Sequence, residues 1–305
     1  MRRKRKKKDV QEFERHLMHN VLDLHHDLAS GEYRHGGYKH FKISDPKPRD
    51  IHKASVRDRL LHHAIYRVLY PHFDKKFIAD SYSCRIGKGT HKAIHRFRQF
   101  AYKVSKSNTR TCWVLKCDIK KFFASVDHET LNAILRRRIK DEHIFVLLKN
   151  IIGSFCSTPD VEQRGLPLGN LTSQLLVNIY MNEFDQYVKH KLKAGHYIRY
   201  ADDFAILSRD KGYLTRLLLH IEAYLRDELK LQLHPNKVFI KTLASGLDFL
   251  GWVHFPDHRV LRTATKRRMF RRVEETDRKK AIINSYLGLL SHGNARKLEA
   301  KIEVL

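Results

Sequence analysis

The chain has 305 residues, 42% of them hydrophobic, and it carries 60 Lys and Arg against 33 Asp and Glu, a formal net charge of +27. This length allows one large or two modest domains with ample core. The basic excess indicates a polyanionic partner, above all nucleic acid. A basic membrane-surface protein is disfavoured, because the sequence has no 18-residue apolar run and no signal peptide, so we expect no membrane contact.

The cysteines indicate the redox environment. Cys84, Cys112, Cys117 and Cys156 form no paired CxxC set, which disfavours a zinc site. We expect them to be reduced thiols in a cytoplasmic protein.

The N-terminal part begins with an unbroken basic run, Arg2 to Lys8. We expect residues 1–12 to be a solvated tail, with contact to a phosphate backbone and a nuclear signal as the alternatives. Apolar residues then recur at helical spacing before Gly31, which predicts an amphipathic helix with its stripe in the core: Phe13, Leu17, Val21, Leu24 and Leu28. Ser55, three residues before Asp58, predicts the start of another helix.

The segment Ser81–His91 contains two glycines around Lys88, with Arg85 just before them. Glycine lets a backbone approach a phosphate closely, and Arg and Lys supply the opposite charge. The spacing is not that of a Walker P-loop. Phosphate contact is therefore a hypothesis that needs the rest of the chain.

The run Trp113–Ile119 is apolar and rich in β-forming residues, with Asp118 near its end and Phe122-Phe123 following. It predicts a buried strand. Asp127 is interpreted as a helix cap rather than a catalytic acid. Further on, the turn at Gly165–Gly169 leads into a helix, and its small residues suit a surface for a base pair and a template strand. Ordinary core packing is the alternative for that helix.

Two β-prone runs within Tyr197–Leu207 flank the adjacent carboxylates of Asp202 and Asp203. Neighbouring strand residues point to opposite faces, so two acids in mid-strand would disturb a core. At the tip of a tight hairpin both turn towards one site. A solvated Asp-Asp turn is one interpretation. The other is a Mg²⁺ site of hard oxygen ligands, completed by Asp118.

The C-terminal part begins with a predicted helix over Leu214–Leu229 and a predicted hairpin over Leu231–Ile240. Phe249–Phe255 is predicted as a strand that carries Gly251. Beyond Arg262 the chain becomes strongly basic and helical. We interpret this part as a small domain that grips a duplex, with a solvated charged helix as the alternative.

The motifs, in this order from about residue 55 to residue 290, resemble those of reverse transcriptases. Tyr200-Ala201-Asp202-Asp203 with Asp118 looks like the family's catalytic centre, and Ser81–His91 resembles its triphosphate-binding fingers motif. Group II intron and retroviral enzymes usually carry Gln-Gly and Ser-Pro where this chain has Leu168-Gly169 and Ser173-Gln174. That variant resembles the enzymes of diversity-generating retroelements.

The resemblance implies an α+β right-hand polymerase. Fingers and palm, an antiparallel sheet plus helices, would span residues 13–257, and a helical thumb would span 258–305. It also implies an RNA-directed DNA polymerase with low fidelity at template adenines. After the thumb we expect no maturase, endonuclease or RNase H region of the kind found in related enzymes.

The resemblance also implies roles for individual residues. The catalytic, metal-binding set is Asp118, Asp202 and Asp203, extended by Ile119, with two Mg²⁺ ions that Mn²⁺ can replace. The nucleotide-binding set is Arg85, Lys88, Phe123, Leu168, Gly169 and Lys237. The primer- and template-binding set is Gly165, Gln174, Tyr200, Gly251, Arg267 and Arg271.

Two of these roles compete with plainer interpretations. Phe123 matches the family's aromatic gate against a ribose 2′-hydroxyl, but it could equally be a core aromatic beside Phe122. Lys237 would donate a proton to pyrophosphate, with an ordinary surface lysine as the alternative.

The expected partners are template RNA, an RNA–DNA duplex, dNTPs and a small basic accessory protein. Two alternatives stay open. One is a group II intron-like or retron-like enzyme with the same chemistry. The other is a non-catalytic RNA-binding protein on a polymerase scaffold, against which the three aspartates argue.

Overall fold

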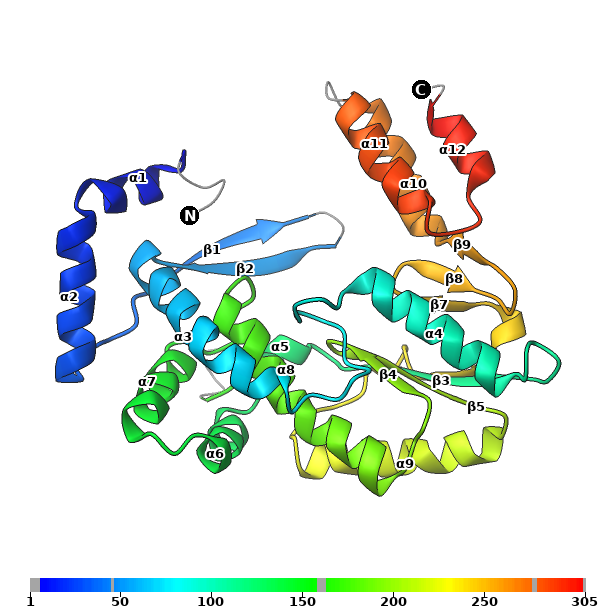
Figure 1. The fold of residues 1–305 in the computed structure, drawn as a ribbon, viewed down its shortest axis with the longest axis horizontal. Helices are drawn as coiled ribbons and strands as arrows, with labels where there is room; N and C mark the ends of the chain where they lie inside the picture. The colour runs from blue at the N-terminus through cyan, green and yellow to red at the C-terminus, as the bar shows by residue number, and fades with distance from the viewer. Residues whose placement is uncertain (1–5, 45–46, 158–162, 276–278, 304–305) are drawn as a thin grey trace. The chain divides into compact units, whose positions relative to one another are not determined.

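The computed structural model describes residues 6–44, 47–157, 163–275 and 279–303, which form an α+β structure of helices and antiparallel sheets (Figure 1). The chain divides into two compact units. Unit 1 comprises Met1–Ala79, Ile119–Lys191 and Glu222–Leu233. Unit 2 comprises Asp80–Asp118, Leu192–Ile221 and His234–Leu305.

Unit 1 is mostly helical. Its only hairpin among the described residues pairs β1 (Tyr38–Ile43) with β2 (Arg49–Ala54). Its helices are α1 (Lys8–Arg15), α2 (Leu17–Ser30), α3 (Val56–Asp74), α5 (Phe122–Ser125), α6 (His128–Arg138), α7 (Glu142–Gly153), α8 (Leu171–Gln186) and the short π-helix η1 (Tyr187–Lys191). Helix α9 (Lys211–Asp227) belongs partly to each unit.

The helix starts predicted from capping residues are confirmed. Ser55 precedes α3, and its hydroxyl accepts a bond from the Asp58 N–H at 3.1 Å. Asp127 precedes α6 and accepts from the Thr130 N–H at 2.9 Å. Each cap satisfies a backbone donor that the first helical turn leaves without a partner.

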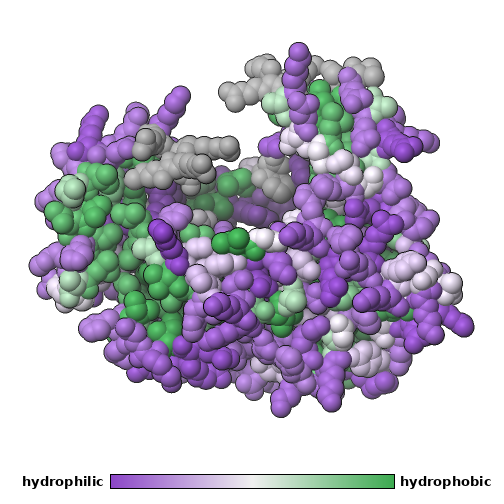
Figure 2. Space-filling view, in the orientation of Figure 1, coloured by the Kyte–Doolittle hydropathy of each residue, from purple (hydrophilic) through white to green (hydrophobic). Residues whose placement is uncertain are grey.

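The N-terminal helix departs from its prediction in two ways. It is broken at His16 into α1 and α2, and α1 already begins within the basic run, with Val10 buried. Residues 2–5 of that run lie outside the described part. The prediction that the stripe packs in the core was wrong for Leu17 and Val21, which are exposed together with Met18 and Leu22. Figure 2 shows hydrophobic side chains gathered over α2.

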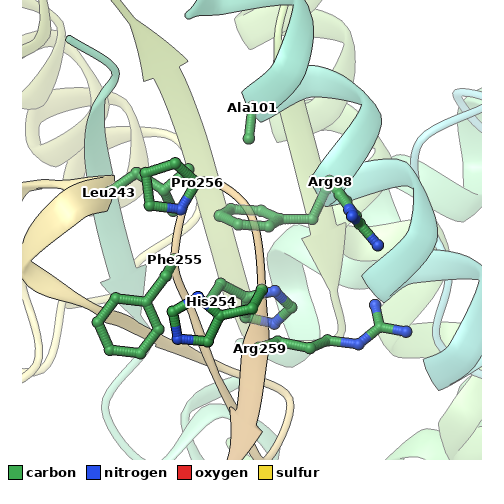
Figure 3. A pocket seen from close by; sticks show the side chains of 9 residues that line it. Arg98, Ala101, Leu243, His254, Phe255, Pro256 and Arg259 are labelled. Atoms are coloured by element: carbon green, nitrogen blue, oxygen red, sulfur yellow. The ribbon is translucent and has the colours of Figure 1, made fainter. Parts of the chain in front are cut away.

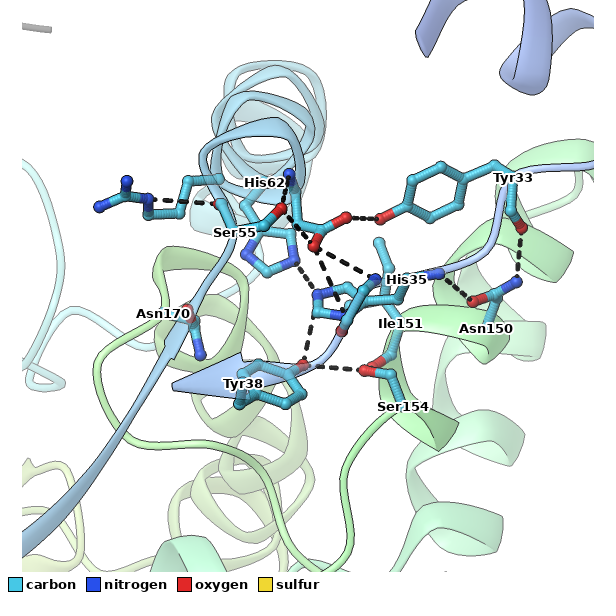
Figure 4. Close-up of polar contacts among 12 residues, drawn as sticks. Tyr33, His35, Tyr38, Ser55, His62, Asn150, Ile151, Ser154 and Asn170 are labelled. Atoms are coloured by element: carbon cyan, nitrogen blue, oxygen red, sulfur yellow. Dashed lines mark hydrogen bonds and ion pairs between the residues drawn. The ribbon is translucent and has the colours of Figure 1, made fainter. Parts of the chain in front are cut away.

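A buried polar network holds the segment between α2 and β1 (Figure 4). Asp58, 1% exposed, accepts hydrogen bonds from the Tyr33 hydroxyl at 2.7 Å, the Ser55 hydroxyl at 2.7 Å and the Gly36 N–H at 3.2 Å. The His35 and His62 Nε2 atoms lie 3.2 Å apart. Burial lowers the pKa of His62 to about 4, so this ring is neutral at pH 7.

Unit 2 contains a four-stranded antiparallel sheet in the order β4-β5-β3-β6. Its strands are β3 (Trp113–Asp118), β4 (Tyr197–Tyr200), β5 (Asp203–Ser208) and β6 (Phe239–Thr242). Helix α4 (Thr90–Val104) packs on one face, and Phe97 and Phe100 from the helix share a core with Val114, Ile198 and Ala205 from the sheet. Burying each large side chain contributes about 1.5–3 kcal/mol.

A second sheet in unit 2 joins β7 (Leu247–Phe249), β8 (Trp252–His254) and β9 (Arg259–Leu261). Three helices follow: α10 (Thr263–Glu274), α11 (Lys279–Leu290) and α12 (Arg296–Glu303). Trp252 from the sheet packs with Met269, Val273 and Leu290 from the helices. The proposed boundary after residue 257 therefore falls in the turn between β8 and β9.

Two strand predictions in this part were wrong. Phe249–Phe255 is not one strand but a hairpin, in which Leu250 and Gly251 form the turn at φ 53° and 87°. Leu231–Ile240 is not a hairpin, because its β-forming residues pair with distant partners. Leu233 bridges to Ile119, and β6 pairs with β3.

Candidate active site

Three carboxylates gather at one end of the four-stranded sheet. Asp118, the last residue of β3, is the direct cross-strand partner of Asp203, the first residue of β5. The final pair of the β4–β5 hairpin is Tyr200 with Asp203, so Ala201 and Asp202 form a two-residue turn. The prediction that the acids lie at a hairpin tip beside a third strand end is thus confirmed as geometry.

The turn is conformationally strained. Ala201 has φ 58°, a left-handed conformation that costs a non-glycine residue roughly 1–2 kcal/mol. Two-residue hairpin loops require positive φ at a central residue to match the strand twist. Arg199, 1% exposed, donates from Nη1 to the Ala201 carbonyl at 2.9 Å. This hydrogen bond holds the turn that presents Asp202.

Negative charge accumulates at this sheet end. Burial raises the pKa of Asp203 to about 6; the Lys116 ammonium opposes that shift, and Asp202 and Asp118 add to it. Burial and Asp118 likewise raise the pKa of Asp202. A site that disfavours its own anions in this way favours a bound cation.

Lysines balance two of the acids. The buried Lys116 pairs with Asp203, and Lys237 Nζ lies 3.0 Å from Asp118 Oδ1. Lys116 follows the period of the strand, two residues before Asp118 on the same face of β3. That spacing is a sequence signal for a functional lysine that our sequence analysis did not use.

The donor set suits a hard divalent cation in kind, because three carboxylates supply the oxygen ligands that Mg²⁺ prefers. Ile119, directly after Asp118, is buried. Among the described residues, no three His, Cys, Asp or Glu side chains stand at ligand spacing. Instead, Asp118 pairs with Lys237 and Asp203 pairs with Lys116.

The segment expected to bind triphosphate is anchored to strand β4. Ser81 forms a parallel bridge with Arg199, and the Tyr82 N–H donates to the Arg199 carbonyl at 3.0 Å. Arg199 Nη2 also lies 3.3 Å from the Ser81 hydroxyl. Arg85 Nη1 donates to the Ser81 carbonyl at 3.0 Å, and Lys88 Nζ lies 5.0 Å from the Tyr82 ring centroid. Arg85 and Lys88 thus sit on a loop fastened to the aspartate hairpin.

The remaining predicted residues of unit 2 are distributed over several elements. The Tyr200 hydroxyl accepts from Thr90 Oγ1 at 3.1 Å, at the start of α4. Gly251 is in the β7–β8 turn with nothing within 4 Å of an added Cβ. Arg267 and Arg271 are exposed one turn apart on α10, so they present two positive charges on one helix face.

The other predicted residues lie in unit 1. Phe122 is buried at 4% exposure whereas Phe123 is half-buried, so of the two neighbours Phe122 is the core aromatic. The Phe123 carbonyl accepts from the Leu166 N–H at 2.8 Å, and the Gly165 N–H donates to Val126 at 2.8 Å. These bonds place Phe123 beside the turn that leads into α8.

Leu168 and Gly169 are fastened to β2. The Leu168 carbonyl accepts from the His52 N–H at 3.0 Å. Gly169 has φ 105°, and an added Cβ would lie 2.9 Å from the Ile51 side chain, so both conformation and space require glycine. Gln174 is half-buried in the first turn of α8.

Comparison with solved structures identifies the fold. The telomerase of Candida tropicalis, truncated from its C-terminal domain, aligns with TM-score 0.58 at 12% identity over 81% of this chain and 60% of that one. The telomerase of Candida albicans, in complex with a TWJ fragment of telomeric RNA, aligns with TM-score 0.57 at 9% identity over 77% of this chain and 48% of that one. This chain therefore has a polymerase fold.

The sequence comparison identifies the family. Residues 42–254 match the family described as reverse transcriptase (RNA-dependent DNA polymerase), so the chain belongs to the reverse transcriptases. Protein YkfC of Escherichia coli K12 is 27% identical over 299 residues, covering 85% of this chain and 75% of YkfC. The group II intron-encoded protein LtrA of Lactococcus lactis is 23% identical over 297 residues, covering 74% of this chain and 47% of LtrA.

Two further predictions can be compared with the structure. All four cysteines are free. No helix among the described residues is long and apolar enough to cross a membrane.

Proposed function

We propose that this reverse transcriptase copies a template RNA into cDNA with Asp118, Asp202 and Asp203 as its catalytic residues. The observation that carries the proposal is the pairing of Asp118 with Asp203 across two strands, with Asp202 in the adjoining turn. In the reaction, the primer 3′-oxygen bonds to the α-phosphorus of a dNTP. The bond from that phosphorus to the bridging oxygen breaks, and pyrophosphate leaves.

The three aspartates, with Ile119, would hold two Mg²⁺ ions, which Mn²⁺ can replace. Such ions supply activation of the 3′-hydroxyl and neutralise charge on the departing pyrophosphate. Lys237 would give a proton to pyrophosphate, and its Nζ lies 3.0 Å from Asp118 Oδ1. Arg85 and Lys88 hold the triphosphate, and their loop is bonded to the strand that precedes Asp202.

Phe123 selects deoxyribose by its bulk, and its half-buried position leaves part of the ring accessible. Leu168 and Gly169 contact the incoming nucleotide. Gly165, Gln174, Tyr200 and Gly251, with Arg267 and Arg271 on the proposed thumb of residues 258–305, contact primer and template. A small basic accessory protein is an expected partner.

The catalytic assignment is tested by primer extension on poly(rA)/oligo(dT) with Mg²⁺. Asp202→Asn removes the charge of the carboxylate and nearly preserves its shape, so we expect extension to be lost while the melting temperature and RNA binding stay close to wild type. Glu228→Gln, at an exposed acid just after α9, is the matched control and should extend normally. Extension by Asp202→Asn at the wild-type rate would reject the assignment.

Two kinds of reverse transcriptase remain as candidates for the biological role. Leu168 in place of glutamine supports a diversity-generating enzyme, because an apolar side chain cannot hydrogen-bond the incoming nucleotide, and packing alone discriminates by about 1–3 kcal/mol. Similarity to LtrA and other intron-encoded proteins supports a group II intron-like enzyme. Sequencing cDNA copied from a defined RNA separates them. Errors concentrated opposite template adenines favour the first, and even fidelity favours the second.

A further inference from the structure

A hollow in unit 2 lies between α4 and the turn that joins β8 to β9 (Figure 3). Its apolar wall includes Phe97, Ala101 and Leu243. Its polar side chains are those of Arg98, Arg259, His254 and His258, and no Asp or Glu is among the lining residues. Arg98 and Arg259 extend to the same side of the hollow in Figure 3.

The two arginines donate hydrogen bonds to backbone carbonyls. Arg98 Nη2 donates to the Asp257 carbonyl at 3.3 Å, and Arg259 Nε donates to the His292 carbonyl. Neither guanidinium forms an ion pair within the described part of the chain. The carboxylate of Asp257 lies 2.9 Å from His258 Nδ1. Burial, and after it the positive charge of Arg98, lowers the pKa of Arg259.

Two half-buried arginines of unit 2, close to these two in sequence, have acidic partners. Arg96, two residues before Arg98 on α4, pairs with Asp80 at 2.8 Å. Arg262, just beyond β9, pairs with Asp248 at 3.0 Å. Arg98 is exposed and Arg259 is half-buried, so two like charges face one hollow without a carboxylate in its lining. An anion bound between them would be attracted by both charges.

We propose that this hollow is a phosphate-binding site, in which Arg98 and Arg259 together hold one phosphodiester of a nucleic-acid strand. Guanidinium groups bind phosphate through paired N–H donors, and two of them match its oxygens and charge. The ligand's identity rests on the chain's membership of the reverse transcriptases. It does not rest on the roles proposed for the aspartates, because the site shares no residue with them.

The test measures binding of single-stranded RNA and of an RNA–DNA duplex by fluorescence anisotropy across a KCl series, without nucleotide. The variant is Arg98→Gln/Arg259→Gln. Each lost phosphate contact lowers the slope of log K against log salt by about 0.7 for a single strand and 0.9 for a duplex. We expect a loss of about one contact on at least one of the two ligands.

The control is Arg110→Gln/Arg226→Gln, which also removes two positive charges, but at exposed positions outside the hollow. It should keep the wild-type slope. A second variant, Arg98→Lys/Arg259→Lys, keeps the charge but loses the paired donors, and we expect weaker binding with a nearly unchanged slope. Thermal melting establishes that each variant is folded.

Titration with inorganic phosphate distinguishes a strand from a free ion. If phosphate protects the wild type and not the Gln variant against melting, while RNA binding is equal in both, the site holds free phosphate and the strand proposal is wrong. The strand proposal would also be overturned if the wild type and the Gln variant had equal slopes of log K against log salt. The same holds if the control variant lost as much of that slope as the Gln variant. Because no catalysis is measured, failure here leaves the Asp202→Asn result standing.

Discussion

Arg199 offers the sharpest test of how the candidate active site is held together. Its guanidinium donates to the carbonyl of Ala201 at 2.9 Å and lies 3.3 Å from the hydroxyl of Ser81. One buried side chain thus joins the aspartate turn to the loop that carries Arg85. We predict that Arg199→Met lowers both stability and kcat.

The size of the effect follows from these contacts. A hydrogen bond from a charged donor contributes about 1.5–3 kcal/mol, so loss of two should cost about 3 kcal/mol or more. At roughly 2–4 °C per kcal/mol, the melting temperature should fall by about 6–12 °C. If the turn then moves by about 1 Å, kcat should fall by about 100-fold. KM for the dNTP should change less, because Arg85 itself is intact.

The assay is steady-state primer extension on poly(rA)/oligo(dT), with kcat and KM for dTTP measured at a temperature where every variant is folded. Met269→Ala is the control for stability alone. Met269 is fully buried in the core around α10, and its truncation should cost a similar 2–5 kcal/mol. That variant should keep kcat. Arg199→Lys keeps the charge but has one donor group, so it should recover only part of kcat.

Added guanidinium ion provides a further readout. It should partly restore kcat in Arg199→Ala, because it can occupy the space of the missing group. The reasoning fails if Arg199→Met keeps the wild-type kcat. It also fails if Met269→Ala loses as much kcat as Arg199→Met, since the loss would then reflect stability alone.

Three further predictions concern sugar selection, fidelity and pH. Phe123→Ala should admit ribonucleotides, and an unchanged ratio of rNTP to dNTP incorporation would show that its ring is not the gate. Leu168→Gln should reduce errors opposite template adenines in sequenced cDNA, whereas equal error spectra in both proteins would contradict the proposed role of Leu168. His62 has a pKa of about 4 when folded against an ordinary value of 6.5, so stability is full above pH 6.5 and falls as pH drops towards 4. Protonation of His62 alone should lower the free energy of unfolding by about 2 kcal/mol at pH 5 relative to pH 7.5. In urea unfolding, the stability of His62→Gln should therefore depend less on pH than that of the wild type. An equal loss of stability at pH 5 in wild type and variant would contradict this role of His62.

Local patterns were enough to predict much of the active site. The two β-prone runs that flank Asp202 and Asp203 predict a hairpin, and the pairing of Tyr200 with Asp203 confirms it. Asp118 was predicted at a strand end from its apolar run alone. Capping by Ser55 and Asp127 was also predictable, because a cap involves residues only three positions apart.

The failures arose where distant segments decide the structure. The β-forming residues of Leu231–Ile240 pair with β3 and Ile119, more than 100 residues away, so no local rule could assign them. The apolar residues of α2 recur at helical spacing, and this spacing does not tell whether that face is buried. Leu17 and Val21 are exposed because no neighbouring element of the described chain covers them.

The sequence by itself determined the reverse transcriptase motifs, because the identity and order of residues such as Asp118, Asp202 and Asp203 are local properties. Only the tertiary structure showed that Lys116 pairs with Asp203, that Arg199 ties the aspartate turn to Ser81, and that Arg98 and Arg259 line one hollow. Each of these arrangements brings together segments that are far apart in the sequence. Burial and charge compensation depend on such neighbours, and a linear pattern does not contain them.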